Sequence, residues 1–358
     1  MNLVFQNYFL ASMASRLFQQ KINKLFHQHL KPIVSNTNFQ DSRYFQTAMF
    51  EMQDEMGKKL KAVEQQEVEA FALEFLNSLK QVDVNEMLKS ANVQCKDLKC
   101  QLESENEQAA ALIGLIEEAE KQAPFISFVI LNRLHLLDLI KSITEPEHIF
   151  KEYRRERVGE HRARIAMQLI GAVVESLYKN YIKVVWELWR VSQGDTKIAT
   201  TDSYAYITKK LIKQLPAKYQ VLIHEHASLL RNAAQHYSYW YEPKKDLIVV
   251  VQDNGQPPVA IKVHHVYKMA KAMYEISGSY FFHIHRLYTM KLFGSKAFLK
   301  PIFKAFKKAN FETLDELGKL DFRELEQQME LLFQPVQKYE FIRAKPSKPA
   351  VALPTQNP

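Results

Sequence analysis

Cysteine is scarce in this chain of 358 residues, which excludes a disulfide-rich scaffold. The two cysteines, Cys95 and Cys100, form one C-x4-C pair without a second pair, whereas a structural zinc site usually needs four ligands. We therefore expect two reduced thiols, as in a cytoplasmic protein, and neither a metal site nor a cofactor.

Glycine is also scarce, at 9 residues, and the sequence contains neither a glycine-rich phosphate loop nor a Gly-x-Ser-x-Gly nucleophile elbow. Leu, Glu, Lys, Gln and Ala are plentiful, so the composition favours helices over sheets. No stretch reaches the roughly 18 apolar residues of a membrane span, and no positive charge precedes the apolar part of the first 15 residues. We expect neither a membrane span nor a signal peptide.

Charge is unevenly distributed along the chain. Residues 1–150 contain 15 Lys and Arg and 20 Asp and Glu, a net charge of −5, and residues 151–358 contain the remaining 33 and 20, a net charge of +13. A basic half attached to an acidic half indicates a polyanionic partner for the basic half. A solvated basic surface without a partner is the alternative.

Hydrophobic periodicity predicts a mainly α protein, with helical bundles and a short β-hairpin. Four segments follow from it: an N-terminal helical domain of unknown role at residues 1–150, the main bundle at residues 151–280, a C-terminal helical extension at residues 281–342 and a disordered tail at residues 343–358. The tail is expected because it combines four prolines with small residues.

Within the main bundle the pattern predicts three helices, a hairpin and a closing helix. The expected elements are helices at 160–192, about 203–215 and about 218–239, strands at 247–252 and 259–263, and a helix at about 266–276. In the extension, residues 296–308 form a basic amphipathic stretch whose aromatic side chains we expect to pack on the protein rather than on RNA or a membrane. The three tryptophans, Trp186, Trp189 and Trp240, are likewise expected in the core.

The helix predicted at 218–239 separates polar from apolar side chains at 100° per residue. Its apolar face includes Leu230, Ala233 and Tyr237. Its polar face contains Glu225, Ser228, Arg231, Asn232, Gln235 and His236. Arg231, Asn232 and His236 lie at different angles on that face, an arrangement that suits three groups around one phosphate.

These three residue types suit metal-independent cleavage of RNA. Histidine can take a proton from a 2′-hydroxyl or give one to the leaving 5′-oxygen. Arginine can stabilise the phosphate as negative charge develops, and asparagine can orient either group. The 2′-hydroxyl is an internal nucleophile, so the chemistry needs no metal and leaves a 2′,3′-cyclic phosphate and a 5′-hydroxyl.

The segment from His226 to Tyr237, followed by Tyr241 to Val251, resembles the HEPN superfamily. Members of that family carry Arg-x4–6-His late in a helix, often with a polar residue directly after the arginine. The resemblance extends over residues 155–280 and is motif-specific only around residues 226–251. It implies a helical bundle of HEPN type with a short hairpin, endoribonuclease activity without a metal, and a site completed by two HEPN units that face each other.

By position, the resemblance makes Arg231 and His236 the catalytic pair and Asn232 the polar accessory, with Glu225, Ser228 and Gln235 as further accessory candidates. It implies an RNA substrate and a homodimer. A role as a toxin or antiviral defence effector, with an antitoxin or another regulatory partner, rests on analogy with the family alone.

Two other functions stay open. The chain could be a non-catalytic HEPN module that binds RNA or a partner protein, or a structural helical adaptor on which Arg231 and His236 are ordinary surface residues. The spacing alone is a weak signal, because Arg154 and Arg155 each reach His161 at a similar spacing. Neither of those arginines is followed by asparagine.

Overall fold

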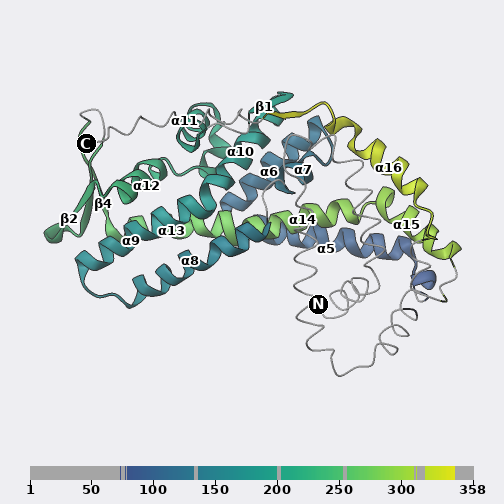
Figure 1. Ribbon diagram of the computed structural model, residues 1–358, viewed down its shortest axis with the longest axis horizontal. Helices are drawn as coiled ribbons and strands as arrows, with labels where there is room; N and C mark the ends of the chain where they lie inside the picture. The colour runs from purple at the N-terminus through teal and green to yellow at the C-terminus, as the bar shows by residue number, and fades with distance from the viewer. Residues whose placement is uncertain are drawn as a thin grey trace, which may run out of the picture.

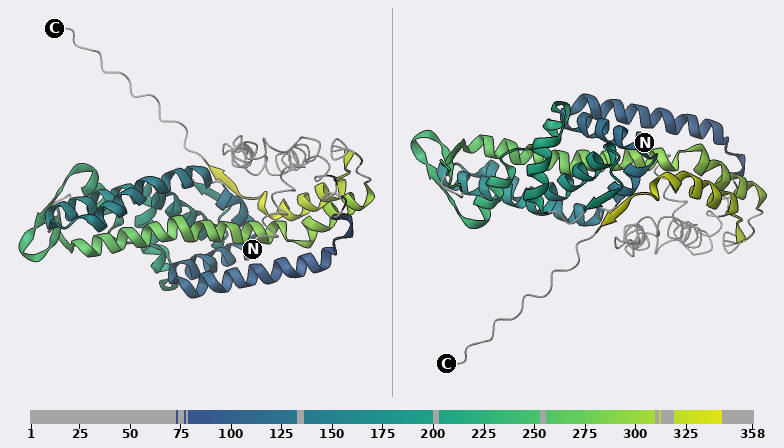
Figure 2. Two further views of the ribbon diagram at one scale, coloured as in Figure 1. Left: turned by 90° about the horizontal axis from the view of Figure 1, so that it is seen from below. Right: turned by 90° about the horizontal axis from the view of Figure 1, so that it is seen from above.

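The computed structural model describes a mainly helical molecule with small β-sheets (Figure 1). It describes residues 73, 77, 79–132, 136–199, 203–252, 256–309, 312 and 319–342. The tail predicted at residues 343–358, and most of the first half of the predicted N-terminal domain, lie outside the described residues. The long helices run along an elongated molecule that has a β-sheet at one end and helices α15 and α16 at the other (Figures 1 and 2).

The first described part of the chain is helical, as predicted. It contains the 3₁₀ turn η2 (Leu79–Gln81) and the helices α5 (Val84–Glu105), α6 (Glu107–Gln122), α7 (Ile126–Asn132) and α8 (Leu136–Arg155). Asp83 caps α5 by accepting a hydrogen bond from the backbone N–H of Asn85 at 2.8 Å. Asn106 caps α6 in the same way through the N–H of Ala109 at 3.0 Å.

The long helix predicted at 160–192 is confirmed, with one irregularity. It consists of α9 (Gly159–Val173), a π-helical turn η3 (Val174–Tyr178) and α10 (Lys179–Ser192). Gly194 follows with a φ of +82°, a left-handed conformation that glycine adopts without steric strain. The sequence pattern therefore gave the length and end of this helix but not the π turn within it.

The helix predicted at about 218–239 is confirmed only for Ala227–His236, and its first half is not α-helical. The structure has α11 (Tyr204–Gln214), a 3₁₀ segment η4 (Ala217–Leu222), a turn, and α12 (Ala227–His236). Ile223 is extended between η4 and α12, because the buried Tyr178 hydroxyl accepts a hydrogen bond from the backbone N–H of His224 at 2.9 Å and donates one to the carbonyl of Leu222 at 3.3 Å. A contact with a residue this far away in the chain leaves no trace in the local periodicity.

The predicted hairpin is confirmed and belongs to a three-stranded antiparallel sheet. The strands are β2 (Tyr239–Glu242), β3 (Leu247–Val250) and β4 (Val259–Lys262), in the order β2-β3-β4, with a short turn η5 (Pro243–Lys245) before β3. Val250 pairs with Val259 across the hairpin, and Tyr239 pairs with Val250 on the other side. The sequence pattern missed β2 because it extended the preceding helix through Tyr239.

The C-terminal elements return along the molecule. They are α13 (Val263–Tyr274), a π turn η6 (Glu275–Tyr280), α14 (Phe281–Phe293), α15 (Lys296–Lys308), α16 (Arg323–Phe333), η8 (Gln334–Val336) and β5 (Glu340–Ile342). Strand β5 pairs in parallel with β1 (Lys197–Ala199). In α15, Phe298, Ile302 and Phe306 are buried, which confirms that this basic stretch packs its apolar face on the protein.

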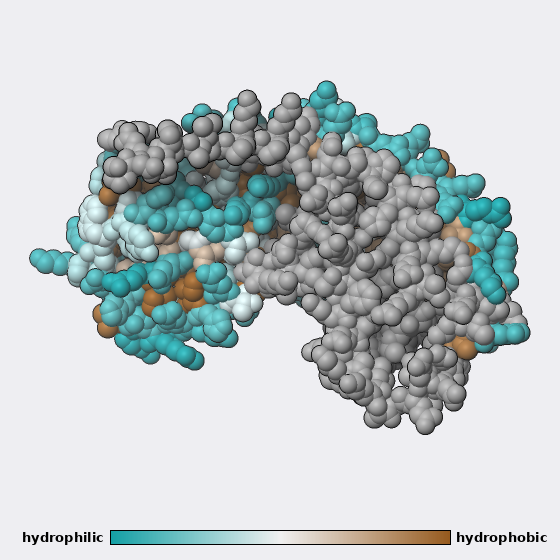
Figure 3. Space-filling view, in the orientation of Figure 1, coloured by the Kyte–Doolittle hydropathy of each residue, from teal (hydrophilic) through white to brown (hydrophobic). Residues whose placement is uncertain are grey.

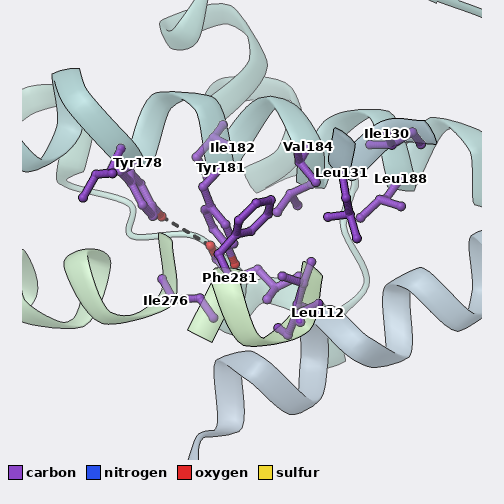
Figure 4. Packing of buried hydrophobic residues seen from close by; sticks show 14 of the residues in the cluster. Leu112, Ile130, Leu131, Tyr178, Tyr181, Ile182, Val184, Leu188, Ile276 and Phe281 are labelled. Carbon is purple, nitrogen blue, oxygen red and sulfur yellow. Dashed lines mark hydrogen bonds between the residues drawn. The ribbon is translucent and has the colours of Figure 1, made fainter. Parts of the chain in front are cut away.

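Most of the buried hydrophobic residues form one continuous cluster between Leu102 and Phe341. Leu112 of α6, Tyr181 of α10 and Phe281 of α14 meet within it, so residues from all three predicted helical segments share this core (Figure 4). Trp186 and Trp189 are buried in it as predicted, whereas Trp240 is half exposed. No helix in the described part of the chain combines the length and apolar character that crossing a bilayer requires.

Candidate functional site

Helix α12 carries the predicted motif and packs against α9. Ala227, Leu230 and Ala233 are buried on one side of α12. A Cβ atom added at Gly171 of α9 would lie 3.2 Å from the Cβ of Ala234, so the two helices approach closely there. This close packing fixes the rotation of α12 and leaves its polar side chains at the edge of the interface with α9.

Arg231 is held by an ion pair that the sequence pattern did not reveal. Its Nε donates to Oε1 of Glu175, and its Nη1 donates to Oδ1 of Asn232 at 2.9 Å. The side chains of Arg231 and Glu175 are 29% and 31% exposed, so the pair is shielded from solvent but still accessible. The structure thus brings Arg231 and Asn232 together, with one face of the guanidinium fixed and the Nη2 group left to donate elsewhere.

Glu175 forms ion pairs with two cationic side chains, those of Arg231 and Lys179. It also accepts a hydrogen bond from Lys179 Nζ at 2.8 Å, one turn along the same helix. Burial alone would raise the pKa of Glu175, but the hydrogen bonds from Lys179 and Arg231 outweigh it and hold the pKa below its ordinary value. The carboxylate is therefore ionised at neutral pH and gives Arg231 a fixed counter-charge.

Glu175 lies in the π turn η3, and irregular turns of this kind recur at functional sites. Its spacing of four residues from Lys179 is a local sign of an ion pair that sequence reasoning could have used. The contact with Arg231 crosses 56 residues of sequence, and nothing in the local pattern indicates it.

Tyr204, the first residue of α11, is another member of this neighbourhood that sequence reasoning missed. Burial raises the pKa of its phenol, and the charge of Arg231 acts in the opposite direction. The hydroxyl is buried without a hydrogen-bond partner in the described structure. The net shift is upward, so the phenol stays neutral and can serve only as an uncharged hydrogen-bonding group beside Arg231.

His236 is the last residue of α12 and is exposed. Among the described residues, its imidazole has no hydrogen-bond or ion-pair partner. Five residues separate it from Arg231, which on a helix corresponds to about 140° of rotation and about 7.5 Å of rise. The structure therefore places His236 on the same helix as Arg231 but does not bring the two side chains into contact.

The three accessory candidates are less closely associated with the motif. Glu225 is exposed in the turn before α12, which corrects its predicted place on the helix. Ser228 is half-buried in the first turn of α12, and Gln235 is exposed beside His236. In the described structure, none of them makes a hydrogen bond with Arg231, Asn232 or His236.

Tyr237 was predicted on the apolar face, and this is wrong. The residue ends α12 in the left-handed conformation, with a φ of 54°, and its side chain is 80% exposed. A non-glycine residue in this conformation is uncommon, and its backbone turns the side chain away from the core. Tyr237 and the half-exposed Trp240 therefore present two aromatic rings to solvent directly after His236.

The other histidine and arginine patterns do not form comparable sites. His224 is largely buried, with its Nε2 at 3.2 Å from Gln108 Nε2, and burial lowers its pKa to about 4. The loose match between Arg154 or Arg155 and His161 is split by the turn between α8 and α9, so its members do not share a helix. His161 instead lies near Glu156, with its Nδ1 at 3.6 Å from Oε2.

The site therefore consists of an anchored arginine with its asparagine on one side of α12 and an unengaged histidine at the end of the same helix. Comparisons of the chain with protein-family models, curated proteins and solved structures find no match.

Proposed function

We propose that the chain is a metal-independent endoribonuclease of HEPN type that cleaves RNA by attack of the 2′-hydroxyl on the adjacent phosphate. The observation that carries the proposal is the motif on α12: Arg231 hydrogen-bonded to Asn232 and anchored by Glu175, with His236 unengaged on the same helix. The resemblance of this segment to the HEPN superfamily supports the same reaction.

The anchored arginine suits transition-state stabilisation. Glu175 occupies Nε and Asn232 occupies one N–H of Nη1, so three of the five guanidinium N–H groups remain for phosphate oxygens. Because the ion pair already fixes the guanidinium, little further ordering is needed when the phosphate gains negative charge. Asn232 keeps its side-chain NH₂ group for the RNA or for the histidine, since only its oxygen is used here.

The reaction needs one group to take a proton and another to give one. The 2′-oxygen forms a bond to phosphorus, the bond from phosphorus to the 5′-oxygen breaks, and the leaving oxygen gains a proton. A single α12 supplies one histidine, so a second copy of the chain would supply the other across a two-fold axis. Such an arrangement needs an accessible His236, and the imidazole is exposed.

The ion pair also favours a second candidate, a non-catalytic module that binds RNA or a partner protein. Glu175 offsets the charge of Arg231, which would weaken its attraction for a phosphate. A cellular role as a toxin or antiviral defence effector follows only from the family resemblance.

One experiment separates the two candidates. Purified wild type and His236→Ala are incubated with total RNA in excess EDTA, and the ends of any fragments are identified. Cleavage by the wild type alone, with 2′,3′-cyclic phosphate ends, supports the enzyme. RNA binding without cleavage supports the module, and cleavage that EDTA abolishes and Mg²⁺ restores contradicts the metal-independent mechanism.

A further inference from the structure

A small pocket rich in arginine lies apart from α12, where the end of α8 and the turn into α9 meet α13. Its volume is about 190 Å³. It is lined by Tyr153, Arg154, Glu156, Arg157, Arg162 and Tyr267. None of these residues belongs to the motif on α12, so the pocket is a separate feature of the molecule.

One side of the pocket is a rigid aromatic and cationic stack. The rings of Tyr153 and Tyr267 are parallel to within 9°, with their centroids 4.1 Å apart. The guanidinium carbon of Arg162 lies 4.8 Å from the centroid of the Tyr153 ring, and its Nη2 donates to the Tyr153 hydroxyl at 3.2 Å. The Nε of Arg162 is buried without a hydrogen-bond partner in the described structure. A buried donor of this kind is costly unless a ligand or water satisfies it.

The pocket also carries positive charge that no described ion pair neutralises. Arg154 and Arg157 are exposed, and neither has an ion-pair partner among the described residues. The carboxylate in the pocket, Glu156, is already engaged: its Oε1 accepts hydrogen bonds from the backbone N–H groups of Arg157 and Val158, each at 2.7 Å. The pocket therefore combines three arginines with one carboxylate, of which one oxygen is already engaged by the backbone.

The surrounding surface extends this charge. Residues 151–164 contain six Lys and Arg against three Glu. The surface around the end of α8 in Figure 3 is largely hydrophilic, with one hydrophobic patch within it. Lys262 and Lys268 flank the start of α13. Desolvation, the charge of His265 and the charges of these two lysines lower the pKa of His264 there. The pocket alone would be enough to bind a single small anion. A basic surface that continues outside the pocket also suits a polyanion, which extends beyond it.

We propose that this pocket binds a phosphate group of the RNA backbone, away from the scissile phosphate. The inference rests on the proposed function, which supplies RNA as the ligand. Arginine forks match the geometry of phosphate oxygens, and the Tyr153–Tyr267 stack holds Arg162 in place so that its ordering cost is met before RNA binds. The pocket thereby fixes how RNA lies on the end of the molecule that carries the three-stranded sheet.

The test removes two exposed charges from the pocket and compares them with two removed elsewhere. Arg154→Gln/Arg157→Gln and the control Lys307→Gln/Lys308→Gln, at the far end of α15, each lose two exposed positive charges. Both double substitutions are introduced into the His236→Ala variant so that the RNA is not cleaved. Binding of a single-stranded RNA is followed by fluorescence anisotropy at several salt concentrations. We expect the pocket variant to lose roughly ten-fold in affinity and about 0.7 or more in the slope of log K against log salt, and the control to change little.

The outcomes distinguish the pocket from the proposed function. Equal affinity and salt slope in both variants would contradict RNA binding by the pocket and would point to an acidic partner protein as its ligand. Cleavage of RNA by the wild type would not be affected by that result. RNA binding that depends on the pocket, in a protein that never cleaves RNA, would support the pocket and contradict the enzyme. Absence of RNA binding in the unmodified protein would overturn both. Unchanged melting temperatures of the two variants exclude unfolding as the cause.

Discussion

The guanidinium of Arg231 and the carboxylate of Glu175 form an ion pair that joins α12 to the π turn of the long helix, across 56 residues of sequence. The role of this ion pair determines whether the motif on α12 can be catalytic. If Glu175 orients Arg231, the ion pair prepares the arginine for the phosphate. If it mainly neutralises Arg231, the arginine is a structural residue and the motif is not catalytic.

Replacement of Glu175 by glutamine separates these two roles. Glu175→Gln keeps the size of the side chain and loses its charge, so Arg231 becomes less well anchored but more positive. We expect single-turnover cleavage to fall about ten-fold, with RNA affinity unchanged or tighter, because positioning matters more to the transition state than to binding. Lys179→Gln is the matched control, since it removes the other cation on Glu175 and leaves the ion pair with Arg231. A cleavage rate equal to that of the wild type would assign Glu175 a purely structural role.

Alanine at the two motif positions should separate activity from stability. His236→Ala should abolish cleavage without a measurable change in melting temperature, because the imidazole is exposed and makes no described hydrogen bond. Arg231→Ala should also abolish cleavage, but at a cost of about 1 kcal/mol in the free energy of unfolding, because it breaks a partly shielded ion pair. Denaturant titration of both variants measures the difference. If Arg231→Ala unfolds while Arg231→Lys restores stability without activity, the stability and the chemistry still separate.

Two largely buried histidines make stability depend on pH. Burial lowers the pKa of His224 and of His285 to about 4, below the ordinary 6.5. Both are neutral in the folded and unfolded chain above pH 6.5, so neither costs stability there. Between pH 6.5 and 4 only the unfolded chain binds the proton, so the free energy of unfolding falls as the pH falls, by at most about 1.4 kcal/mol per pH unit for each histidine.

The measurement is the denaturant midpoint from pH 7 to pH 4.5 in the wild type and in His285→Gln. His285 Nε2 lies 3.1 Å from Asn132 Oδ1, and glutamine keeps a donor for that oxygen without titrating. We expect the variant to lose part of the pH dependence in this window. His283→Gln, at a half-buried histidine two residues away on the same helix, is the control. A pH dependence that is the same in all three proteins would contradict the assignment.

Local signals predicted the fold where the structure is determined locally. The extent of the helix at 160–192, the helix at about 203–215 and the hairpin strands at 247–252 and 259–263 all follow from periodicity and from residues that start or end elements. The break at Ile223 and strand β2 did not, because the hydroxyl of Tyr178 holds the chain extended before α12. The left-handed Tyr237 then ends the helix two residues before the strand begins.

The same division applies to the candidate site. The motif from Arg231 to His236 is contiguous, so the sequence alone predicts it. Glu175 lies in η3 and Tyr204 in α11, and only the packing of these elements against α12 brings them to Arg231. The sequence could not predict the arginine pocket either, because the stacked rings come from Tyr153 of α8 and Tyr267 of α13, which are far apart in the chain.

Assembly provides the last prediction. One α12 supplies one arginine and one histidine, whereas cleavage through a 2′-hydroxyl is best served by a base and an acid on opposite sides of the phosphate. If two copies meet through α12, both His236 side chains enter one site, and specific activity should fall on dilution below the dimer dissociation constant. Light scattering and activity measured over the same concentration range check this.

Mixing the wild type with His236→Ala tests the shared site without a measured dimer dissociation constant. With a nine-fold excess of His236→Ala and full exchange of subunits, only about one tenth of wild-type chains pair with another wild-type chain, so activity per wild-type chain should fall about ten-fold. The same excess of Lys307→Gln/Lys308→Gln should not lower it, because that variant keeps the motif on α12 and changes only exposed lysines. Activity per wild-type chain that is unaffected by His236→Ala, in a protein that light scattering shows to be a monomer, would contradict the shared site. The acid and base would then both have to come from one chain, and His161 with Arg154 or Arg155, near the turn between α8 and α9, would be the next set to replace.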